Sequence, residues 1–525
     1  MNMGERITEL RKSKGLSQEE LAEQLGVSRQ SVSKWETGVS TPDTDKALAM
    51  SRIFGVTADF LLTGESNNSA LSSGDVVYNK NTVLENAQPA TAPISEQKEE
   101  KDRETFKLPN WKTLVSIAVA LCLIIGIVAI AFSGKDKNPI AELVEDVPYT
   151  YVLVHGMGGW GEKAPMNDVA PYWGSSSGSI SAYLRTQDIQ VVEATVGPFS
   201  SAWDRACELY AQLTGTKVDY GEAHSKEHGH ARFGRTYTEP LVERWDKKAK
   251  INLIGHSFGG NTIRLFTSLL EYGSEAEKQA SPDDCSPLFE GGKGKYVNSV
   301  TTLASPHNGS TLFYCLDYGP MIELALNLLY TANGVGSISN VELLDFQLEH
   351  FGISADNHNT SVLVSGSFGN GNDNAFYDLS PHGAKELNSK IKLVDSVYYF
   401  SYAYCTTTEA TVFGNQVPTK DTMGVLMVPA GMIGAYTNKR ADARVVIDEK
   451  WLPNDGLVNV ISAQYPSEDA YINYVTEETK IEKGQWYVFP TLTGDHGTAI
   501  GMNGNVESTR DFYMNHITLV DGLKG

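Results

Sequence analysis

The sequence predicts a multi-domain chain with an all-α helix-turn-helix head, a single transmembrane helix and a C-terminal α/β domain. Three observations support this prediction. Residues 5–62 form short helical patterns separated by glycines, residues 114–132 carry no charge, and residues 251–270 run from a strand pattern through Gly-x-Ser-x-Gly into a helical pattern. A chain of 525 residues is also too long for one ordinary domain. We expect a head at 1–65, a flexible linker at 66–110, a transmembrane helix at 111–133, a second linker at 134–147 and the α/β domain at 148–525.

Charge is spread unevenly along the chain, whose formal net charge is −21. Residues 1–65 carry 8 Lys and Arg against 10 Asp and Glu, and residues 66–133 carry 6 against 7. Of the chain totals of 43 and 64, this leaves 29 against 47, so the acidity belongs to the C-terminal part. An acidic surface favours solubility and argues against a large nucleic-acid footprint there. Five scattered cysteines are too few for a disulfide scaffold.

The head consists of helical patterns joined by glycine turns. Ser17-x-x-Glu20 is a capping box that opens one helix, and Gly26 makes the turn that follows it. Ser28 caps the next helix, which Gly38 closes. Two helices joined by a Gly-containing turn at this spacing predict a helix-turn-helix.

The run from residue 21 to residue 38, LAEQLGVSRQSVSKWETG, closely resembles the Cro-like phage-repressor family, also called the XRE family. The resemblance covers about the first 65 residues and implies that the second helix enters the major groove of DNA. It implies base-edge contacts for Arg29, Gln30 and Lys34. It also implies that Gln18 and Ser28 lie near phosphates. The alternative is a retained module that no longer binds DNA, which the slightly acidic balance of the head favours.

Residues 66–107 are rich in Ser, Asn, Ala, Pro, Glu and Lys, a composition typical of a flexible linker. Residues 114–132 are nineteen consecutive residues without a charge. At ~1.5 Å per residue, a helix of this length spans roughly 28 Å, about the hydrocarbon thickness of a bilayer. A buried core helix would carry polar positions on one face, and a signal peptide would lie at the N-terminus. We therefore expect a membrane span.

Basic residues are more frequent before this predicted span than after it. Five precede it and two follow it: Lys98, Lys101, Arg103, Lys107 and Lys112, then Lys135 and Lys137. The positive-inside rule then places the N-terminus in the cytoplasm and the C-terminal domain outside. The predicted localisation is the cell membrane, with a single pass, a cytoplasmic N-terminus and an extracellular C-terminal domain.

The C-terminal domain contains the pattern Gly255-His256-Ser257-Phe258-Gly259 between a strand pattern and a helical pattern. This arrangement is the nucleophile elbow of the α/β-hydrolases, whose serine sits on a tight, strained turn with its hydroxyl exposed. Gly-x-Ser-x-Gly alone is a weak pattern that can occur by chance. The flanking strand and helix supply the context that it requires, and we predict an α/β-hydrolase C-terminal domain with Ser257 as nucleophile.

A serine hydroxyl needs an imidazole to take its proton, and the imidazole needs a carboxylate to hold its tautomer. Ser257, Asp455 and His496 follow the chain order nucleophile, acid, base of the α/β-hydrolases. Of the other histidines, His256 adjoins the nucleophile but points elsewhere on the elbow, and His155 belongs to a His-Gly loop after the predicted strand 149–154. On local sequence alone, Asp455 could equally be a turn aspartate before glycine.

Longer runs are more specific than the elbow. They are VGPFSSAWDRAC at 196–207, DYGEAH at 219–224, HGHARFGRTY at 228–237, YDLS at 377–380 and WLPNDG at 451–456. From about residue 149 onward, they make the chain resemble the zinc-containing thermoalkalophilic bacterial lipases, relatives of the staphylococcal lipases. The resemblance implies Ser257, Asp455 and His496 as the catalytic triad. It also implies oxyanion-hole donors from the backbone N–H groups of Met157 and Phe258.

The same resemblance implies a structural zinc ion bound by Asp204, His224, His230 and Asp373. Two imidazoles and two carboxylates suit a closed tetrahedral zinc site. From spacing alone, the two histidines could instead be polar surface residues.

The sequence departs from the resembled family at two places. The family binds calcium through a glutamate two residues past the catalytic histidine and through an Asp-Pro pair further on. Thr498, Asn503 and Gly504 stand at these positions, so calcium is doubtful. Met157 replaces an aromatic residue of the oxyanion loop, which changes the expected acyl pocket. Residues 312–332 are apolar and correspond to the family's lid, although an ordinary core helix explains them equally well.

We therefore expect a membrane-anchored serine esterase or lipase, hydrolysing carboxylic esters as triacylglycerol lipases do, with a cytoplasmic sequence-specific DNA-binding head. The alternative is a membrane-bound one-component transcriptional regulator whose hydrolase-fold domain senses a ligand. An intact triad separates the two, because a pure sensor need not keep it. The expected partners are an ester or lipid substrate, DNA and the membrane. A homodimer is compatible with the sequence, which leaves the oligomeric state, acyl-chain preference and DNA operator open.

Overall fold

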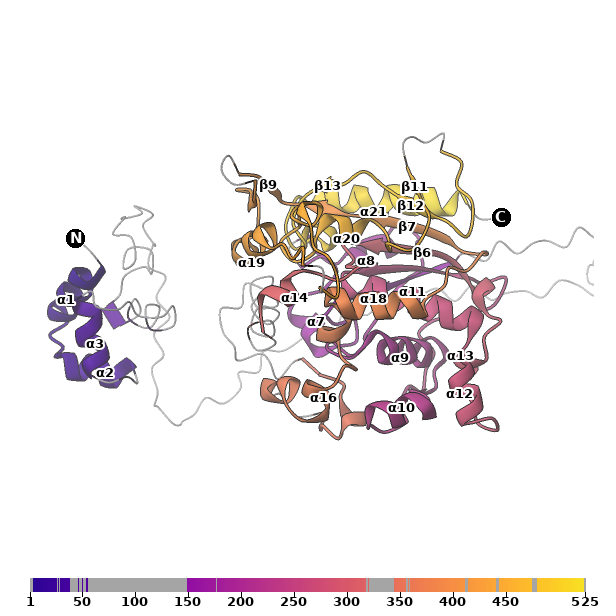
Figure 1. The fold of residues 1–525 in the computed structure, drawn as a ribbon, viewed down its shortest axis with the longest axis horizontal. Helices are drawn as coiled ribbons and strands as arrows, with labels where there is room; N and C mark the ends of the chain where they lie inside the picture. The colour runs from indigo at the N-terminus through magenta and orange to yellow at the C-terminus, as the bar shows by residue number, and fades with distance from the viewer. Residues whose placement is uncertain are drawn as a thin grey trace, which may run out of the picture. The chain divides into compact units, whose positions relative to one another are not determined.

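The computed structural model describes the chain in two separate parts (Figure 1). The described residues are 3–37 except 26 and 28, then 46, 50 and 53–54, and 149–523 except 176, 318–319, 321–343, 356, 358, 411–413, 441–442 and 475–478. Internal contacts divide the chain into one unit at Met1–Gly134 and another at Lys135–Gly525. The predicted linkers at 66–110 and 134–147 and the predicted span at 111–133 lie outside the described residues.

The first unit is a small helical cluster. Its described helices are α1 (Met3–Ser13), α2 (Gln18–Leu25) and α3 (Arg29–Glu36). The predicted capping box is confirmed, because Ser17 N–H donates to Glu20 Oε2 at 2.7 Å and Glu20 N–H donates to Ser17 Oγ at 3.2 Å. The apolar faces of the helices meet in one core that contains Ile7, Leu21, Val32 and Trp35.

The structure contradicts the predicted single-pass membrane localisation, which is therefore corrected. Within the described ranges, no helix is both long enough and apolar enough to cross a membrane. The longest described helix, α21 (Val506–Asp521), has 16 residues and carries Glu507, Arg510 and Asp511. A membrane span needs about 20 predominantly apolar residues. The uncharged run at 114–132, on which the prediction rested, lies outside the described residues.

The second unit is built on a seven-stranded sheet with the strand order β11-β12-β7-β6-β5-β1-β2. Every pairing in this sheet is parallel. The strands are β1 (Thr150–Val154), β2 (Val191–Ala194), β5 (Ile251–His256), β6 (Val297–Leu303), β7 (Tyr398–Tyr402), β11 (Tyr471–Asn473) and β12 (Trp486–Val488). Every residue of the central strands β5 and β6 is buried, as expected for a parallel sheet covered on both faces.

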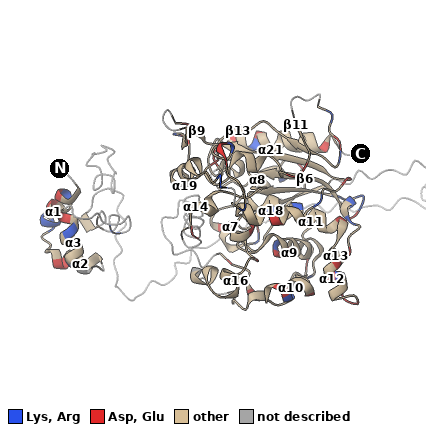
Figure 2. Ribbon diagram, in the orientation of Figure 1, with Lys and Arg blue, Asp and Glu red and all other residues tan. Residues whose placement is uncertain are grey.

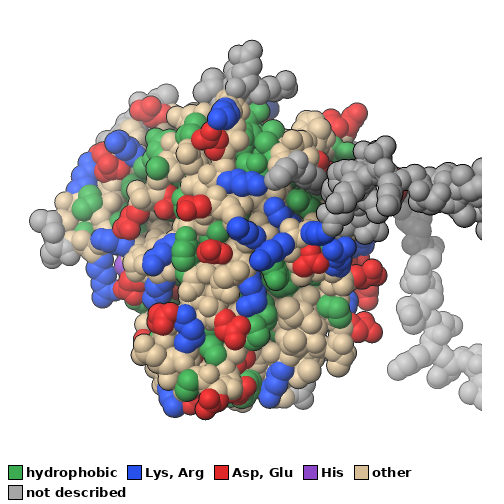
Figure 3. Space-filling view, turned by 90° about the vertical axis from the view of Figure 1, so that its right-hand side faces the viewer, with side chains coloured by type: hydrophobic (Ala, Val, Ile, Leu, Met, Phe, Trp, Pro, Cys, Tyr) green, Lys and Arg blue, Asp and Glu red, His purple; other side chains and the backbone are tan. Residues whose placement is uncertain are grey.

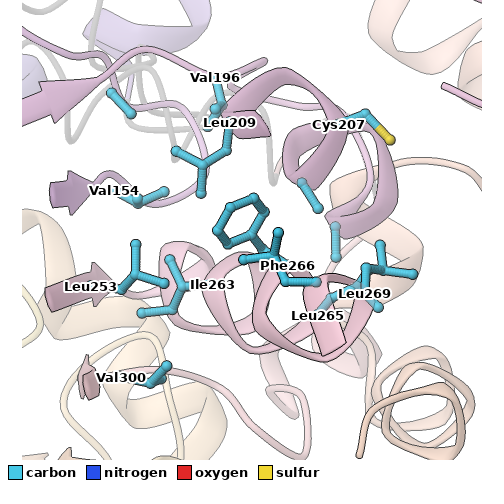
Figure 4. Packing of buried hydrophobic residues seen from close by; sticks show 14 of the residues in the cluster. Val154, Val196, Cys207, Leu209, Leu253, Ile263, Leu265, Phe266, Leu269 and Val300 are labelled. Atoms are coloured by element: carbon cyan, nitrogen blue, oxygen red, sulfur yellow. The ribbon is translucent and has the colours of Figure 1, made fainter. Parts of the chain in front are cut away.

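Two apolar clusters cover the two faces of the sheet. Alternate residues of β1 enter different clusters, because successive side chains of a strand point to opposite faces. One cluster includes residues of α8 (Ile180–Arg185) and α21. The other joins the strands to α9 (Ala202–Thr214) and α11 (Phe258–Tyr272). Figure 4 shows Phe266 of α11 directed into this second cluster, toward Leu209 of α9 and Val154 of β1.

Shorter elements surround this framework. They are α7 (Pro165–Val169), β3 (Lys217–Asp219), α10 (Glu222–His228), β4 (Phe233–Thr236), α12 (Glu275–Ala280), α13 (Pro287–Glu290), α14 (Leu312–Cys315), α16 (Gly366–Asn370), α17 (Ala375–Asp378), α18 (Pro381–Lys390), β8 (Tyr404–Cys405), β9 (Thr407–Glu409), β10 (Gln416–Pro418), α19 (Gly424–Ala435), α20 (Val460–Gln464) and β13 (Leu492–Thr493). On the face shown in Figure 3, basic and acidic side chains lie beside one another over most of the described surface.

Candidate active site

Ser257 lies on a sharp turn between β5 and α11. Its φ of 54° is unusual for a residue with a side chain, so the backbone is strained there. Glycines make the turn feasible: a Cβ added at Gly255 would lie only 2.5 Å from the carbonyl carbon of Gly259. The backbone N–H of Ser257 donates to the carbonyl oxygen of Leu303 in β6 at 2.9 Å. Strand, strained serine and helix therefore form the elbow that the sequence pattern predicts.

The structure brings Asp455 and His496 into direct contact. His496 Nδ1 lies 2.8 Å from Asp455 Oδ2, and the backbone N–H of His496 donates to the Asp455 carbonyl oxygen at 2.8 Å. The other carboxylate oxygen, Oδ1, accepts backbone N–H groups from Leu457 at 2.9 Å and Val458 at 2.7 Å. A carboxylate held in this way accepts a hydrogen bond from the Nδ1–H of the imidazole, which keeps the proton on Nδ1 and leaves Nε2 free to act as a base.

Ser257 and His496 line the same cavity, which is partly open to solvent. Most of its other lining residues are apolar, among them Leu312, Phe313, Leu379, Met423, Val458 and Ile500. A cavity with one polar end and apolar walls suits a ligand with a reactive polar group and a hydrocarbon portion.

The two predicted oxyanion donors lie beside the nucleophile. Phe258 is the first residue of α11, where the backbone N–H groups have no intrahelical acceptor. Met157 lines the cavity. The loop that carries it passes close to Ser257, since a Cβ added at the neighbouring Gly156 would lie 2.7 Å from the Ser257 Cβ.

A buried arginine that sequence reasoning missed supports the oxyanion loop. Arg205 of α9 donates to the carbonyl oxygen of His155, to that of Gly197 at 2.8 Å and to Thr262 Oγ1 at 2.9 Å. Its guanidinium carbon also lies 5.0 Å from the ring centre of Phe258. Burial lowers the pKa of Arg205 to about 10. The contacts join the loop after β1 to the start of α11, and no local pattern identifies them.

His155 has a role in the fold of the same loop. Its Nε2 accepts the backbone N–H of Val196 at 3.2 Å, so its Nδ1–H donates to the Gly156 carbonyl oxygen at 2.8 Å. Burial, with the nearby charge of Arg205, lowers the pKa of His155 to about 3. His155 is therefore neutral and holds the backbone of the loop.

The four predicted metal ligands meet in one cluster. One ligand atom from each of Asp204, His224, His230 and Asp373 lies within 4.8 Å of every other. His224 Nε2 is 3.3 Å from Asp204 Oδ1 and 3.3 Å from Asp373 Oδ2, and His230 Nε2 is 3.2 Å from Asp373 Oδ2. All four of these atoms are buried and make no hydrogen bond within the described part of the chain. A cation would satisfy them together.

The surroundings of the cluster orient its side chains. His230 Nδ1 lies 3.0 Å from the Ala231 carbonyl oxygen, to which it donates, so Nε2 keeps its lone pair for the centre of the cluster. His350, which the sequence did not point to, places Nε2 3.0 Å from Asp204 Oδ2. The His224 ring stacks on Trp203 with ring centres 5.0 Å apart. The cluster joins α9, α10 and the chain between α16 and α17 (Figure 1).

Two of the three residues that made calcium doubtful, Thr498 and Asn503, contact the carboxylate of Asp495. Asp495 Oδ2 accepts the Asn503 side-chain amide at 2.6 Å and the Met423 backbone N–H at 2.9 Å. Asp495 Oδ1 accepts the Thr498 hydroxyl at 3.1 Å. Gly504 has a φ of 132°.

The structure describes four of the five predicted DNA-contacting residues. Arg29, Gln30 and Lys34 are exposed on α3, whereas Val32 and Trp35 are buried. The amide of Gln18 donates to Glu36 Oε2 at 2.7 Å. Figure 2 shows that both basic and acidic residues occur along the described helices of the head. Ser28 lies outside the described residues.

The expected lid at 312–332 is described only in small part. Leu312 and Phe313 of α14 line the cavity. Residues 318–319 and 321–332 lie outside the described residues, so the choice between a lid and a core helix stays open.

Comparisons with known proteins match both units. A family described as "Lipase-like, C-terminal domain" matches residues 147–521, and a family described as "Helix-turn-helix" matches residues 7–61. A lipase of Staphylococcus hyicus is 34% identical over 378 residues, which are 70% of this chain and 54% of that protein. The chain thus spans about half the length of the curated relatives it matches.

Solved structures agree with these matches. EstA from Clostridium botulinum has 36% sequence identity and a TM-score of 0.65, and the match covers 71% of this chain and 87% of that one. Lipase 1 from Pelosinus fermentans has 38% identity and a TM-score of 0.60, covering 71% of this chain and 98% of that one. The α/β unit is thus similar to solved esterase and lipase structures.

Proposed function

We propose that this chain, which belongs to the family of lipase-like C-terminal domains, is a serine carboxylic ester hydrolase with Ser257 as its nucleophile. The observation that carries the proposal is the 2.8 Å contact between His496 Nδ1 and Asp455 Oδ2 at a cavity that Ser257 also lines. Support also comes from the strained backbone at Ser257, whose φ is 54°. These are the parts that an acyl-transfer site requires.

The proposed reaction has two balanced steps. His496 Nε2 takes the proton of Ser257 as Oγ attacks the ester carbonyl carbon, and it returns that proton to the alkoxy oxygen as the C–O bond breaks and the alcohol leaves. Water then attacks the acyl-serine, and His496 again transfers the proton, which releases the carboxylic acid and restores Ser257. The backbone N–H groups of Met157 and Phe258 would stabilise the oxyanion that forms in each step.

The apolar walls of the cavity favour esters with a hydrocarbon acyl chain over small polar esters. The test is hydrolysis of p-nitrophenyl esters of increasing acyl length by the purified chain. We expect turnover that is lost in Ser257→Ala. A folded chain that hydrolyses no ester of any length would overturn the proposal and would favour a domain that only senses its ligand.

We propose that Asp204, His224, His230 and Asp373 hold one structural zinc ion. Support comes from four buried ligand atoms that face one another without hydrogen bonds among the described residues. Two imidazoles and two carboxylates fill a tetrahedral shell and leave no coordination position for a substrate. When bound, the ion would cross-link α9, α10 and the chain before α17, and so stabilise the fold.

We also propose that the head reads a DNA sequence through Arg29, Gln30 and Lys34. Support comes from the helix-turn-helix match at residues 7–61 and from the exposure of these side chains on α3. Arginine pairs with guanine and glutamine with adenine through two hydrogen bonds each. The expected phosphate contacts of Gln18 and Ser28 remain predictions.

A further inference from the structure

A chain of buried hydrogen bonds runs from the oxyanion loop to the backbone of the catalytic base. The backbone N–H of Gly156 donates to the hydroxyl of Tyr172 at 2.8 Å. The same hydroxyl lies 2.7 Å from Nδ1 of His256, and Nε2 of His256 lies 3.0 Å from the carbonyl oxygen of His496. Tyr172 is 6% exposed and His256 is 2% exposed, so these bonds are largely shielded from water, although both residues line the cavity.

The chemistry of the end groups fixes the position of every proton in this hydrogen-bond chain. The His496 carbonyl oxygen can only accept, so His256 carries its proton on Nε2. His256 Nδ1 then has a free lone pair, and the Tyr172 hydroxyl donates to it. The hydroxyl oxygen keeps lone pairs to accept the Gly156 N–H. Burial and the neighbouring His496 hold the pKa of His256 well below its usual range, so the ring is neutral.

The residues of this hydrogen-bond chain are direct neighbours of the reacting groups. Gly156 directly precedes Met157, whose N–H is a proposed oxyanion donor, and His256 directly precedes Ser257. His496 carries the catalytic imidazole on the same residue whose carbonyl oxygen accepts the last bond. One hydrogen-bond chain thereby ties together the oxyanion loop, the elbow and the loop of the base.

We propose that Tyr172 and His256 are positioning residues that fix the oxyanion loop and the catalytic histidine in place relative to each other. This inference rests on the proposed ester hydrolysis. Loss of one of these hydrogen bonds leaves a buried N–H or carbonyl group without a partner. The loop can satisfy that group again only by moving. Catalysis by such donors falls steeply with displacement, because they must point at the developing oxyanion.

Tyr172→Phe is the smallest substitution that interrupts this hydrogen-bond chain. The aromatic ring stays, with its edge-to-face contacts to Trp160 at 5.4 Å and to Trp173 at 5.5 Å between ring centres. In the full-length chain, we expect kcat on a p-nitrophenyl ester to fall by about 10- to 100-fold with KM changed less than about twofold. The affinity for a boronic acid that mimics the tetrahedral intermediate should fall in proportion to kcat/KM.

The matched control is Tyr399→Phe. The buried hydroxyl of Tyr399 also accepts a backbone N–H, from Val394 at 3.0 Å, but it does not line the cavity. This variant loses the same kind of hydrogen bond and should keep its kcat. Equal losses of kcat in the two variants would overturn the inference, because the effect would then be one of general stability.

A double variant tests whether the two residues act as one unit. His256→Asn removes the Nε2–H that donates to His496 and keeps an acceptor near Tyr172. Either substitution breaks the same hydrogen-bond chain. The double variant should therefore be only slightly less active than the less active of the two single variants. Losses that multiply would overturn the inference.

A measurement independent of turnover tests the proton assignment itself. Nuclear magnetic resonance of ¹⁵N-labelled histidine should show His256 as the neutral Nε2–H form from about pH 5 to pH 9. Protonation of His256 in that range, or an Nδ1–H form, would overturn the inference. Failure of the wild-type chain to hydrolyse any ester would overturn the proposed function. Wild-type turnover that Tyr172→Phe leaves unchanged would overturn only the positioning role.

Discussion

His496 and Asp455 contact each other through two hydrogen bonds, one between their side chains and one between their backbones, although 41 positions separate them. The side-chain bond orients the imidazole, and the backbone bond fixes the distance between the two loops. Asp455 is fully buried and His496 is 6% exposed. We therefore expect that substitution of Asp455 disturbs the orientation of the catalytic imidazole.

The first prediction concerns Asp455→Asn. An amide keeps the shape of the side chain, but its NH2 group cannot accept the Nδ1–H of His496, so the imidazole turns to the wrong tautomer. We expect kcat to fall by about 10³- to 10⁴-fold with a small change in KM, measured on a p-nitrophenyl ester. A loss of less than tenfold in the folded variant would remove Asp455 from the proposed triad.

The second prediction concerns the close approach of the oxyanion loop to the nucleophile. Gly156→Ala would place a methyl group 2.7 Å from the Ser257 Cβ and 3.0 Å from the Tyr172 hydroxyl. The loop must move, so we expect kcat to fall at least about 100-fold. The control is Gly431→Ala, where an added Cβ meets nothing within 4 Å and activity should persist. Normal activity in Gly156→Ala would contradict this geometry.

The third prediction concerns the metal cluster. Elemental analysis of the purified chain should find one zinc per molecule, and His230→Ala should lose it. The Tm should then fall by about 5 °C or more, while activity persists at low temperature. His228→Ala is the control, because its ring centre lies 4.5 Å from that of His224 without belonging to the four ligands. A chelator that abolishes turnover without changing the Tm would show that the ion is not structural.

The fourth prediction concerns the head. Selection from random DNA with the full chain should recover one preferred sequence. Arg29→Ala should weaken binding to that sequence by about 10- to 100-fold and relax the preference at one base pair. Lys12→Ala removes an equal charge from an exposed position on α1 and should have a smaller, sequence-independent effect. Binding that ignores both the sequence and Arg29 would reduce the head to a structural module.

Elements specified by neighbouring residues could be predicted from the sequence. The capping box at Ser17 and Glu20 and the elbow at Ser257 each lie within a few residues. Polar residues at the start of β6 are harder to recognise as strand residues, because Asn298 and Ser299 are buried only by donating to Asn252 Oδ1 at 2.9 and 2.8 Å. Pro490, which has no N–H to donate, lies between the short strands β12 and β13.

Contacts between distant segments could not be predicted in the same way. Arg205 lies 50 positions from His155, and His350 lies 146 positions from Asp204. A buried arginine and an isolated histidine leave no periodic pattern, and only the folded sheet brings their partners to them. The local elbow pattern indicates Ser257, whereas the long matching runs indicate the metal ligands and support Asp455 and His496. Local sequence alone leaves Asp455 ambiguous, because its 2.8 Å contact with His496 arises only from the fold.

The most direct test of the account is covalent labelling of the nucleophile. The purified chain is treated with a fluorophosphonate that bears a short alkyl chain, and the modified peptide is identified by mass spectrometry. The account predicts one label per chain, on Ser257, with ester hydrolysis lost in proportion to labelling and neither label nor hydrolysis in Ser257→Ala. Hydrolysis that persists in Ser257→Ala, or a label on another serine that tracks the loss of activity, would contradict it.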